Sequence, residues 1–138
     1  FIFSDLSFPI IGSGKSDISL RLIVNHNAVL ISDDRTIIQE QNGVLKAKCP
    51  ENIKGLLEVR GVGICNLPYK DEEDICLAVE LADSIKKIER LPEKKTIKLL
   101  DSVIPLIKIY AFEPSASEKI IAAICYQKTE NILPFKSD

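Results

Sequence analysis

The sequence predicts a single α/β domain over residues 1–138, built on a strand-rich, mixed sheet with few helices. Three observations lead to this prediction. Short apolar runs recur along the chain between turn residues, which is typical of strands. Only two segments, one near each end, space their apolar residues as a helix does. A glycine-containing loop with the tripeptide Gly-Lys-Ser joins the first apolar run to the first of these helices, as in P-loop proteins.

The first part of the chain is predicted to form a strand, a loop, a helix and a second strand. Residues 1–11 are mostly apolar and lead into the loop at 12–14. Residues 15–25 carry apolar side chains suited to a short helix packed on a sheet. After a polar turn, residues 28–31 form a short apolar run, which predicts a buried strand that ends at the polar residues 32–34.

The middle of the chain is predicted to contain short strands joined by tight turns. Residues 36–38 resume as a strand, and the Asn-Gly pair at 42–43 predicts a hairpin into a strand over 44–47. Pro50 ends that strand because proline lacks a backbone N–H. A further strand is expected over residues 56–60.

Two glycines and an acidic run lie between this strand and the next apolar run. Gly61 and Gly63 stand on either side of Val62 and predict a bend that needs room or a positive φ angle. The acidic run at 71–74 is interpreted as a solvated turn. Residues 75–81 are almost entirely apolar and predict a buried strand.

The last part of the chain is predicted to end in a helix. Residues 82–95 are polar and indicate a surface loop, with strands expected over 96–100 and 104–112. Ser-Ala-Ser-Glu at 115–118 has the pattern of a capping box at a helix start. The expected buried stripe of that helix comprises Ile120, Ile121, Ile124 and Cys125.

Composition excludes several classes of protein. A net charge of −2 provides no basic field for a nucleic-acid backbone. No apolar run approaches the ~20 residues that a membrane helix needs, and residues 1–3 lack the flanks of a signal peptide. The four cysteines form no C-x-x-C pair and His26 is the single histidine, so we expect no zinc site. We expect the cysteines to be buried, reduced thiols, which indicates a cytoplasmic location. The chain starts at Phe1 and contains no methionine, which indicates an incomplete start.

The candidate chemistry begins with a phosphate loop. Backbone N–H groups and a lysine hold the phosphates of a nucleotide, and the serine hydroxyl reaches Mg²⁺. The full pattern asks for glycine at the position occupied by Pro9, which has a fixed φ and no amide hydrogen. The predicted loop comprises Gly12, Ser13, Gly14, Lys15 and Ser16.

Carboxylates follow the predicted phosphate loop. The pair Asp33-Asp34 ends an apolar strand and can supply a base, although paired aspartates also commonly stabilise turns. Glu58 lies within an apolar strand, so its side chain either faces solvent or is paired. Arg60, two residues on, shares its face and offers a structural ion pair as the alternative to a metal site.

These motifs together resemble the catalytic domain of the HPr kinase/phosphorylase family, bacterial serine kinases of the phosphocarrier protein HPr. The stretch Leu-Glu-Val-Arg-Gly-Val-Gly-Ile at 57–64 is highly specific for that family. The likeness extends from about residue 9 to about residue 125 and fits the short form, which lacks a separate N-terminal domain. The other matching stretches are 12–17, 20–23, 30–34, 89–92 and 115–119.

The resemblance implies an ATP-dependent serine protein kinase that also runs the reverse phosphorolysis and regulates the phosphotransferase system. It implies HPr as partner, a hexamer, and ATP with Mg²⁺ as cofactors. It further implies that Lys15 binds nucleotide phosphates, Ser16 and Glu58 hold Mg²⁺, Asp34 is the general base and Arg90 stabilises phosphate. The segment from Glu58 to Asn66 matches a region important for both reactions. The residues expected to support the site are Asp33, Arg60 and Gly61.

Two departures from the family pattern keep other functions open. Pro9 replaces the first glycine of the phosphate loop, and residues 1–8 lack the histidine that members carry on the preceding strand. One alternative is a degenerate member that binds nucleotide or a phosphocarrier and regulates without turnover. A second is a small-molecule kinase on the same scaffold, because a fold alone does not determine the substrate.

Overall fold

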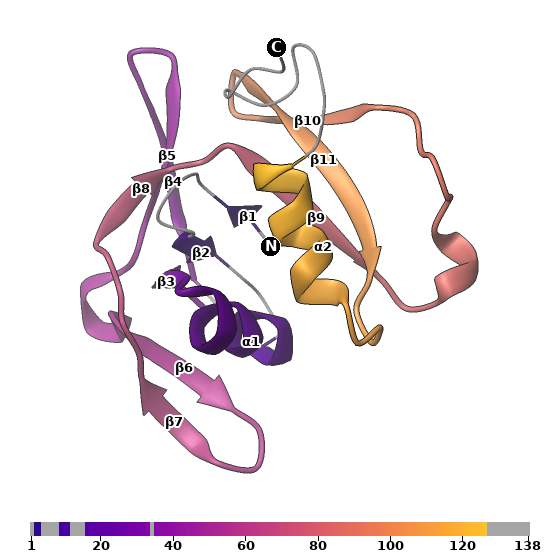
Figure 1. Cartoon of the computed structure of the whole chain (residues 1–138). Helices are drawn as coiled ribbons and strands as arrows, with labels where there is room; N and C mark the ends of the chain where they lie inside the picture. The colour runs from indigo at the N-terminus through magenta and orange to yellow at the C-terminus, as the bar shows by residue number, and fades with distance from the viewer. Residues whose placement is uncertain (1, 4–8, 12–15, 34, 127–138) are drawn as a thin grey trace.

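A computed structural model describes residues 2–3, 9–11, 16–33 and 35–126 of the chain (Figure 1). In these residues the strands outnumber the two α-helices, as the recurring apolar runs predict. No helix among them is long and apolar enough to span a bilayer. The elements in chain order are β1 (Ile2–Phe3), β2 (Pro9–Ile11), α1 (Ser16–His26), β3 (Val29–Ser32), β4 (Ile37–Gln41), β5 (Val44–Lys48), η1 (Glu51–Ile53), β6 (Leu56–Val59), β7 (Gly63–Asn66), β8 (Glu72–Asp74), β9 (Leu77–Ala82), η2 (Ile85–Lys87), β10 (Lys95–Leu99), β11 (Ser102–Tyr110) and α2 (Ala116–Cys125).

The main sheet is mixed, as predicted. Its strand order is β10-β11-β9-β1-β2-β3. β2 runs parallel to β3, and β9 runs parallel to β11, whereas β1 is antiparallel to both β2 and β9. The strands β2, β3, β9 and β11 therefore all point the same way, and their carboxyl ends lie at one edge of the sheet.

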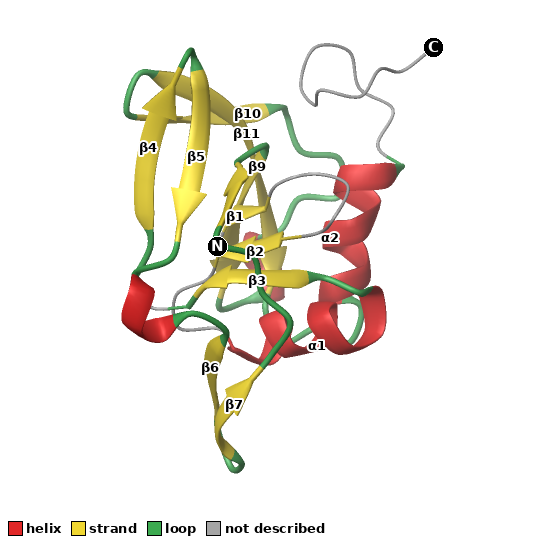
Figure 2. Ribbon diagram, turned by 90° about the vertical axis from the view of Figure 1, so that its left-hand side faces the viewer, coloured by secondary structure: helices red, strands yellow, loops and turns green. Residues whose placement is uncertain are grey.

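The main sheet is covered on both faces, and alternate residues along its strands face different layers. Figure 2 shows α1 and α2 on one side of the sheet and the β4–β5 hairpin on the other. Leu30 packs in the core beneath the helices, while the next residue, Ile31, packs with Leu45 of β5. In β9, Leu77 and Ala78 divide between the two cores in the same way. This double burial explains why strands such as 28–31 and 75–81 are continuous apolar runs in the sequence.

The β4–β5 hairpin confirms the turn predicted from the Asn-Gly pair. Asn42 and Gly43 both have positive φ angles, 53° and 78°. A two-residue turn with positive φ at both positions matches the twist of the flanking strands, and Asn-Gly is the pair that adopts it most readily.

The acidic run at 71–74 was predicted as a solvated turn; it is largely exposed, but the turn is wrong. Residues Glu72–Asp74 form β8, which pairs antiparallel with β5. Lys46 of β5 stands opposite Asp74, and their side chains form an ion pair at 2.8 Å. Lys48 stands opposite Glu72, and Glu73 pairs with Lys70 at 3.0 Å, so nearby lysines offset the acidic charge and the run can join a sheet.

The predicted capping box at the start of α2 does not form. The helix begins at Ala116 as expected, but the Ser115 hydroxyl donates to Glu113 Oε1 at 3.1 Å and makes no cap hydrogen bond. Glu118 instead accepts from His26 Nε2 of α1 at 2.8 Å. A local partner, Glu113, and a tertiary one, His26, therefore occupy the two side chains that would otherwise satisfy the helix terminus. Of the predicted buried stripe, Ile120 and Ile124 are buried, Ile121 is partly buried and Cys125 is exposed.

Other expected boundaries differ in detail. The single strand predicted over residues 1–11 contains two short strands, β1 and β2, which pair with each other. The polar segment 82–95 includes the short helix η2. All four cysteines lie in the described residues and are free thiols. Cys49 is buried as predicted, whereas Cys65 and Cys76 are only partly buried and Cys125 is exposed.

Candidate functional site

The geometry of the candidate site starts from the parallel pair β2 and β3. Ile11, the last residue of β2, stands opposite Ser32, the last residue of β3. The two strands therefore end beside each other at the carboxyl edge of the sheet, where paired strands lie about 4.8 Å apart. In open α/β sheets this edge is where ligands bind.

Part of the predicted site falls outside the described residues. Lys15 and Asp34 belong to this part, so their roles stay predictions. Pro9, whose lack of an amide hydrogen departs from the phosphate-loop pattern, is the first residue of β2, a position that tolerates proline. The other predicted loop residues outside the described ranges are Gly12, Ser13 and Gly14.

The helix that follows the predicted phosphate loop is anchored in the core. α1 starts at Ser16 and runs for 11 residues. Ile18 and Leu22 are almost completely buried beneath the sheet. The first N–H groups of a helix have no intrahelical partner and carry partial positive charge, which suits an anion. The position of α1 thus presents a helix N-terminus immediately after residues 12–15.

A hydroxyl holds the turn that carries the acidic pair. Ser32 is 1% exposed, and its Oγ donates a hydrogen bond to the carbonyl oxygen of Arg35. This bond spans Asp33 and the position of Asp34. Asp33 itself is partly buried and engaged in an interaction. Ser32, the last residue of β3, therefore closes this turn. The sequence had suggested the aspartate pair as the residues that could stabilise it.

The pleat of β6 decides between the two predictions for Glu58. Leu57 and Val59 are buried against α1 and the main core, so Glu58 between them faces solvent. Within the described part of the chain Glu58 makes no ion pair with Arg60, which is also exposed. The structural ion pair considered from the sequence is therefore not present, and the Glu58 carboxylate is accessible.

The bend predicted at Gly61 and Gly63 forms the tip of the β6–β7 hairpin, which extends away from the main sheet in Figure 1. Their φ angles are +87° and +121°, and a Cβ on either residue would meet nothing within 4 Å. The glycines are therefore required for backbone conformation and not for space. Val62 and Ile64 on this hairpin are 75% and 73% exposed.

Arg90 belongs to the segment that follows β9 and η2. Ala78 of β9 is level with Ile11 across the sheet, because both pair with Ile2 of β1. β9 continues for four more residues to Ala82. The segment that carries Arg90 therefore leaves the same edge of the sheet about 13 Å beyond the level of Ile11. Arg90 is exposed and, among the described residues, forms no hydrogen bond or ion pair.

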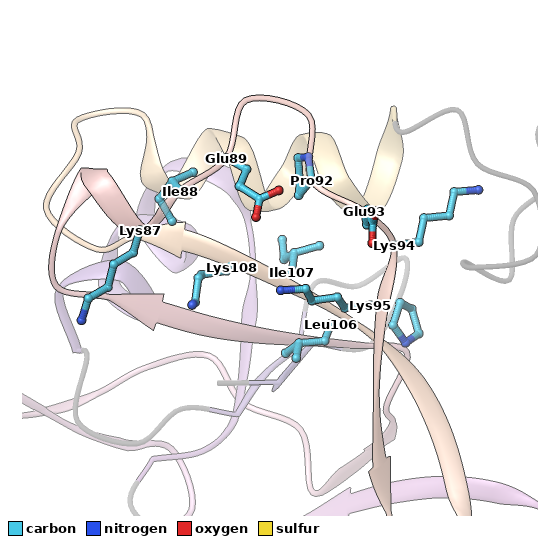
Figure 3. A pocket seen from close by; sticks show the side chains of 11 residues that line it. Lys87, Ile88, Glu89, Pro92, Glu93, Lys94, Lys95, Leu106, Ile107 and Lys108 are labelled. Atoms are coloured by element: carbon cyan, nitrogen blue, oxygen red, sulfur yellow. The ribbon is translucent and has the colours of Figure 1, made fainter.

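The segment after β9 borders two hollows that the sequence analysis did not anticipate. The smaller, of about 160 Å³, is lined by four lysines, Lys87, Lys94, Lys95 and Lys108 (Figure 3). Two of these lysines are already paired, Lys87 with Asp83 at 2.8 Å and Lys108 with Glu80 at 3.4 Å. The hydrogen bond from Lys87 to Asp83 raises the pKa of Lys87 above its ordinary value. The larger hollow, of about 430 Å³, lies between Arg90, β11 and α2.

No described group of three His, Cys, Asp or Glu side chains is arranged to hold a metal ion. Such clustering is not expected for a nucleotide-bound magnesium, which usually takes one or two protein ligands and completes its shell with phosphates and water.

A comparison with protein families identifies the domain. The family model for the HPr Serine kinase C-terminal domain matches residues 10–136, nearly the whole chain.

Curated relatives carry the same name. The HPr kinase/phosphorylase of Brevibacillus brevis is 35% identical, over 71% of this chain and 35% of that protein. Those of a Geobacillus species, strain WCH70, and of Xylella fastidiosa are 34% and 32% identical over the same shares. The chain thus spans about a third of the length of these relatives.

A solved structure shows the same fold. The HPr(Ser) kinase/phosphatase from Coxiella burnetii superposes with a TM-score of 0.71 at 23% sequence identity, and the match covers 87% of each chain.

Proposed function

The chain belongs to the family of HPr serine kinase C-terminal domains, and from this premise we propose that it transfers the γ-phosphoryl group of ATP to a serine hydroxyl of HPr. The relatives' name, HPr kinase/phosphorylase, supports both the substrate and a reverse reaction. The proposal includes a cytoplasmic location, control of the phosphotransferase system and assembly into a hexamer.

One structural observation carries the proposal. β2 and β3 end level with each other, at Ile11 and Ser32, and in the sequence these two residues come just before the phosphate-loop motif and the acidic pair, which supports a shared site at this edge of the sheet. Phosphoryl transfer to a hydroxyl needs a phosphate cradle and a proton acceptor within a few ångströms of each other. A parallel strand pair is a simple way to supply both, because its two carboxyl ends coincide.

ATP and Mg²⁺ fit the residues available. Gly12, Ser13, Gly14 and Lys15 would cradle the phosphates at the N-terminus of α1. Ser16 and Glu58 would hold the magnesium ion. The Glu58 carboxylate is accessible, has no ion-pair partner among the described residues, and is the kind of oxygen ligand that this hard cation prefers. The bound ion supplies positive charge that offsets the negative charge of the phosphate oxygens.

The chain's own residues then handle the proton and the transferred group. Asp34 accepts the proton of the serine Oγ as the bond from Oγ to the γ-phosphorus forms and the bond to ADP breaks. An ordinary aspartate is a weak base, so its contribution depends on being positioned at the hydroxyl. Lys15 and Arg90 stabilise the charge on the transferred oxygens. Asp33, Arg60 and Gly61 support the placement of these groups.

The reverse reaction uses the same groups. Inorganic phosphate attacks the phosphorus of phosphoserine, the bond from phosphorus to Oγ breaks, and pyrophosphate leaves. Asp34 returns its proton to the serine oxygen, so that the carboxyl acts as base in one direction and as acid in the other.

The test is direct. The chain is incubated with HPr, γ-labelled ATP and Mg²⁺, and phosphoserine on HPr is measured. We expect labelled HPr from the native chain, none from Asp34→Asn, and an unchanged rate from Glu93→Gln, a loop carboxylate outside the proposed site. ATP binding without phosphoserine would overturn the kinase proposal in favour of a regulatory member without turnover, the alternative that Pro9 favours. Label in a metabolite from a cell extract, with none on HPr, would indicate a small-molecule kinase.

A further inference from the structure

Two apolar side chains are exposed on the β6–β7 hairpin, and we call them the apolar strip. They are Val62 at the tip, 75% exposed, and Ile64 on β7, 73% exposed. On the opposite face of the hairpin, Leu57 and Val59 are buried and belong to the main core with α1. Among the described residues nothing buries the strip, so it is free to meet another molecule.

The strand register places Ile64 beside Glu58. These two residues stand directly opposite each other in the antiparallel pair of β6 and β7. Directly opposite residues share a face of the sheet, with Cβ atoms about 4.5–5.5 Å apart. The apolar strip therefore begins next to the carboxylate that we propose as a ligand of Mg²⁺.

The tip of the hairpin is held in one conformation. The Val62 N–H donates to the Val59 carbonyl oxygen at 2.9 Å. Gly61 and Gly63 supply positive φ angles of 87° and 121° on either side of Val62. A loop that is already ordered loses little conformational freedom on binding. The hairpin thus presents the strip as a preformed contact.

We propose that Val62 and Ile64 dock an apolar patch of HPr that lies beside its acceptor serine. This inference rests on the proposed function, because transfer to a serine brings the protein that carries it up to the phosphates and the metal ion. A triphosphate offers valine or isoleucine no apolar partner, whereas a protein surface around the reacting hydroxyl does. The only charged residues of the hairpin, Glu58 and Arg60, have opposite signs, so the strip selects for apolar surface and not for charge.

The size of the strip favours a transient substrate over a second copy of this chain. Stable interfaces bury about 800 Å² on each partner and involve about 20–30 residues a side. Two side chains on a projecting hairpin (Figure 1) fall far short of that area. Weak, transient contacts between proteins lie at the low end of interface size.

Direct binding provides the test. HPr carrying a fluorophore is titrated with the native chain or with the double variant Val62→Thr/Ile64→Thr, and fluorescence anisotropy is recorded without nucleotide. Threonine keeps the branched shape and adds no charge beside Glu58. The control, Ile37→Thr/Val103→Thr, changes two exposed strand residues outside the hairpin. We expect Kd to rise about tenfold for the hairpin variant and less than about twofold for the control.

Kinase kinetics provide a second readout. In the hairpin variant KM for HPr should rise by a similar factor, while KM for ATP and kcat at saturating HPr stay at their native values. Because both side chains are exposed, the urea midpoint should not change. If it does, the single variants Val62→Thr and Ile64→Thr repeat the test, each with a smaller rise in Kd.

Three outcomes would overturn the docking of HPr on this strip. The first is a native chain that binds no HPr, and the second is a hairpin variant with native affinity. The third is a hairpin variant that loses self-association but binds HPr as before, which would assign the strip to a second copy. Binding is measured without turnover. Docking can therefore hold where no phosphoserine forms, and phosphoserine can form where the strip has no role.

Discussion

Ile11 and Ser32 stand opposite each other as the last residues of two parallel strands, β2 and β3. Their pairing makes the two strands end at one edge of the sheet, and about 20 residues separate them along the chain; the proposed phosphate loop and acidic pair follow these two strand ends in the sequence. The carboxyl ends of β9 and β11 lie on the same edge. The shared direction of these strands therefore determines where the candidate site lies. The residues proposed for the site can be tested one at a time.

The turn after Ser32 provides the first prediction. Ser32→Ala removes the hydrogen bond from Oγ to the Arg35 carbonyl, which closes the turn around the acidic pair. Because the Ser32 side chain is buried, losing this bond should lower the free energy of unfolding by about 1–1.5 kcal/mol. Kinase activity should fall as well if Asp34, which lies between Ser32 and Arg35 in the sequence, is the base that we propose. Urea unfolding and phosphoserine formation measure the two effects.

Ser102→Ala is the control for that experiment. The Ser102 hydroxyl donates to Glu40 at a solvent-exposed position, so its loss should change stability by no more than about 0.5 kcal/mol. Equal effects of the two substitutions would mean that the Ser32 hydrogen bond has no special role.

Glu58 should separate stability from metal dependence. Because its carboxylate is exposed and unpaired among the described residues, Glu58→Gln should leave the free energy of unfolding within about 0.5 kcal/mol of the native value. The Mg²⁺ concentration for half-maximal kinase activity should rise, since an amide oxygen is a poorer ligand for a hard cation. A Mg²⁺ titration decides the matter, with Glu72→Gln on β8 as the comparison. An unchanged titration would remove Glu58 from the metal site.

Two glycines with similar φ angles should respond differently to alanine. At Gly61, with φ +87° and open space around a Cβ, alanine should cost about 1–2 kcal/mol of unfolding free energy through backbone strain alone. At Gly55, with φ +74°, a Cβ would also lie 2.7 Å from the Tyr69 ring, so the loss should be larger. Denaturant unfolding of Gly61→Ala and Gly55→Ala makes the comparison. A larger loss at Gly61 would contradict this account.

Acid should weaken the start of α2. The ammonium group of Lys119 holds the pKa of Glu113 below its ordinary value, and the Ser115 hydroxyl acts in the same direction. Because the folded pKa is the lower one, the resulting stability is fully present above the unfolded pKa of about 4.3. It is lost as pH falls below that value and through the folded pKa.

Glu113→Gln should therefore lower the melting temperature at pH 7 and flatten its fall between about pH 5 and pH 3. The hydrogen bond from His26 also lowers the pKa of Glu118, so some acid sensitivity will remain in this variant. A native-like pH profile for Glu113→Gln would rule out the Glu113–Lys119 pair as a source of acid sensitivity.

Local sequence signals predicted the elements whose cause is local. The Asn-Gly turn at 42–43 and the glycine bend at 61–63 form as expected, because positive φ angles are a property of those residues. The apolar runs at 28–31 and 75–81 form strands because burial on both faces requires apolar side chains throughout. The predicted mixed sheet follows from these runs together with two amphipathic helices.

Signals that depend on distant partners misled the prediction. The acidic run at 71–74 becomes β8 because lysines of β5 lie opposite it. The expected capping box fails because His26, far away in the sequence, engages Glu118. Neither partner can be recognised from the segment itself, since both arrive through the fold.

The order of residues along the chain established which groups exist to do chemistry: a lysine and serine after a strand, an acidic pair after the next, and a family signature at 57–64. Only the fold made β2 and β3 parallel, with their ends level, and left a groove beside Arg90. The fold also exposes the Glu58 side chain to solvent, with no ion pair to Arg60. The reason is physical. Residue identity sets local conformation and the reactive groups available, whereas strand direction, register and burial arise from contacts between segments that are remote in sequence.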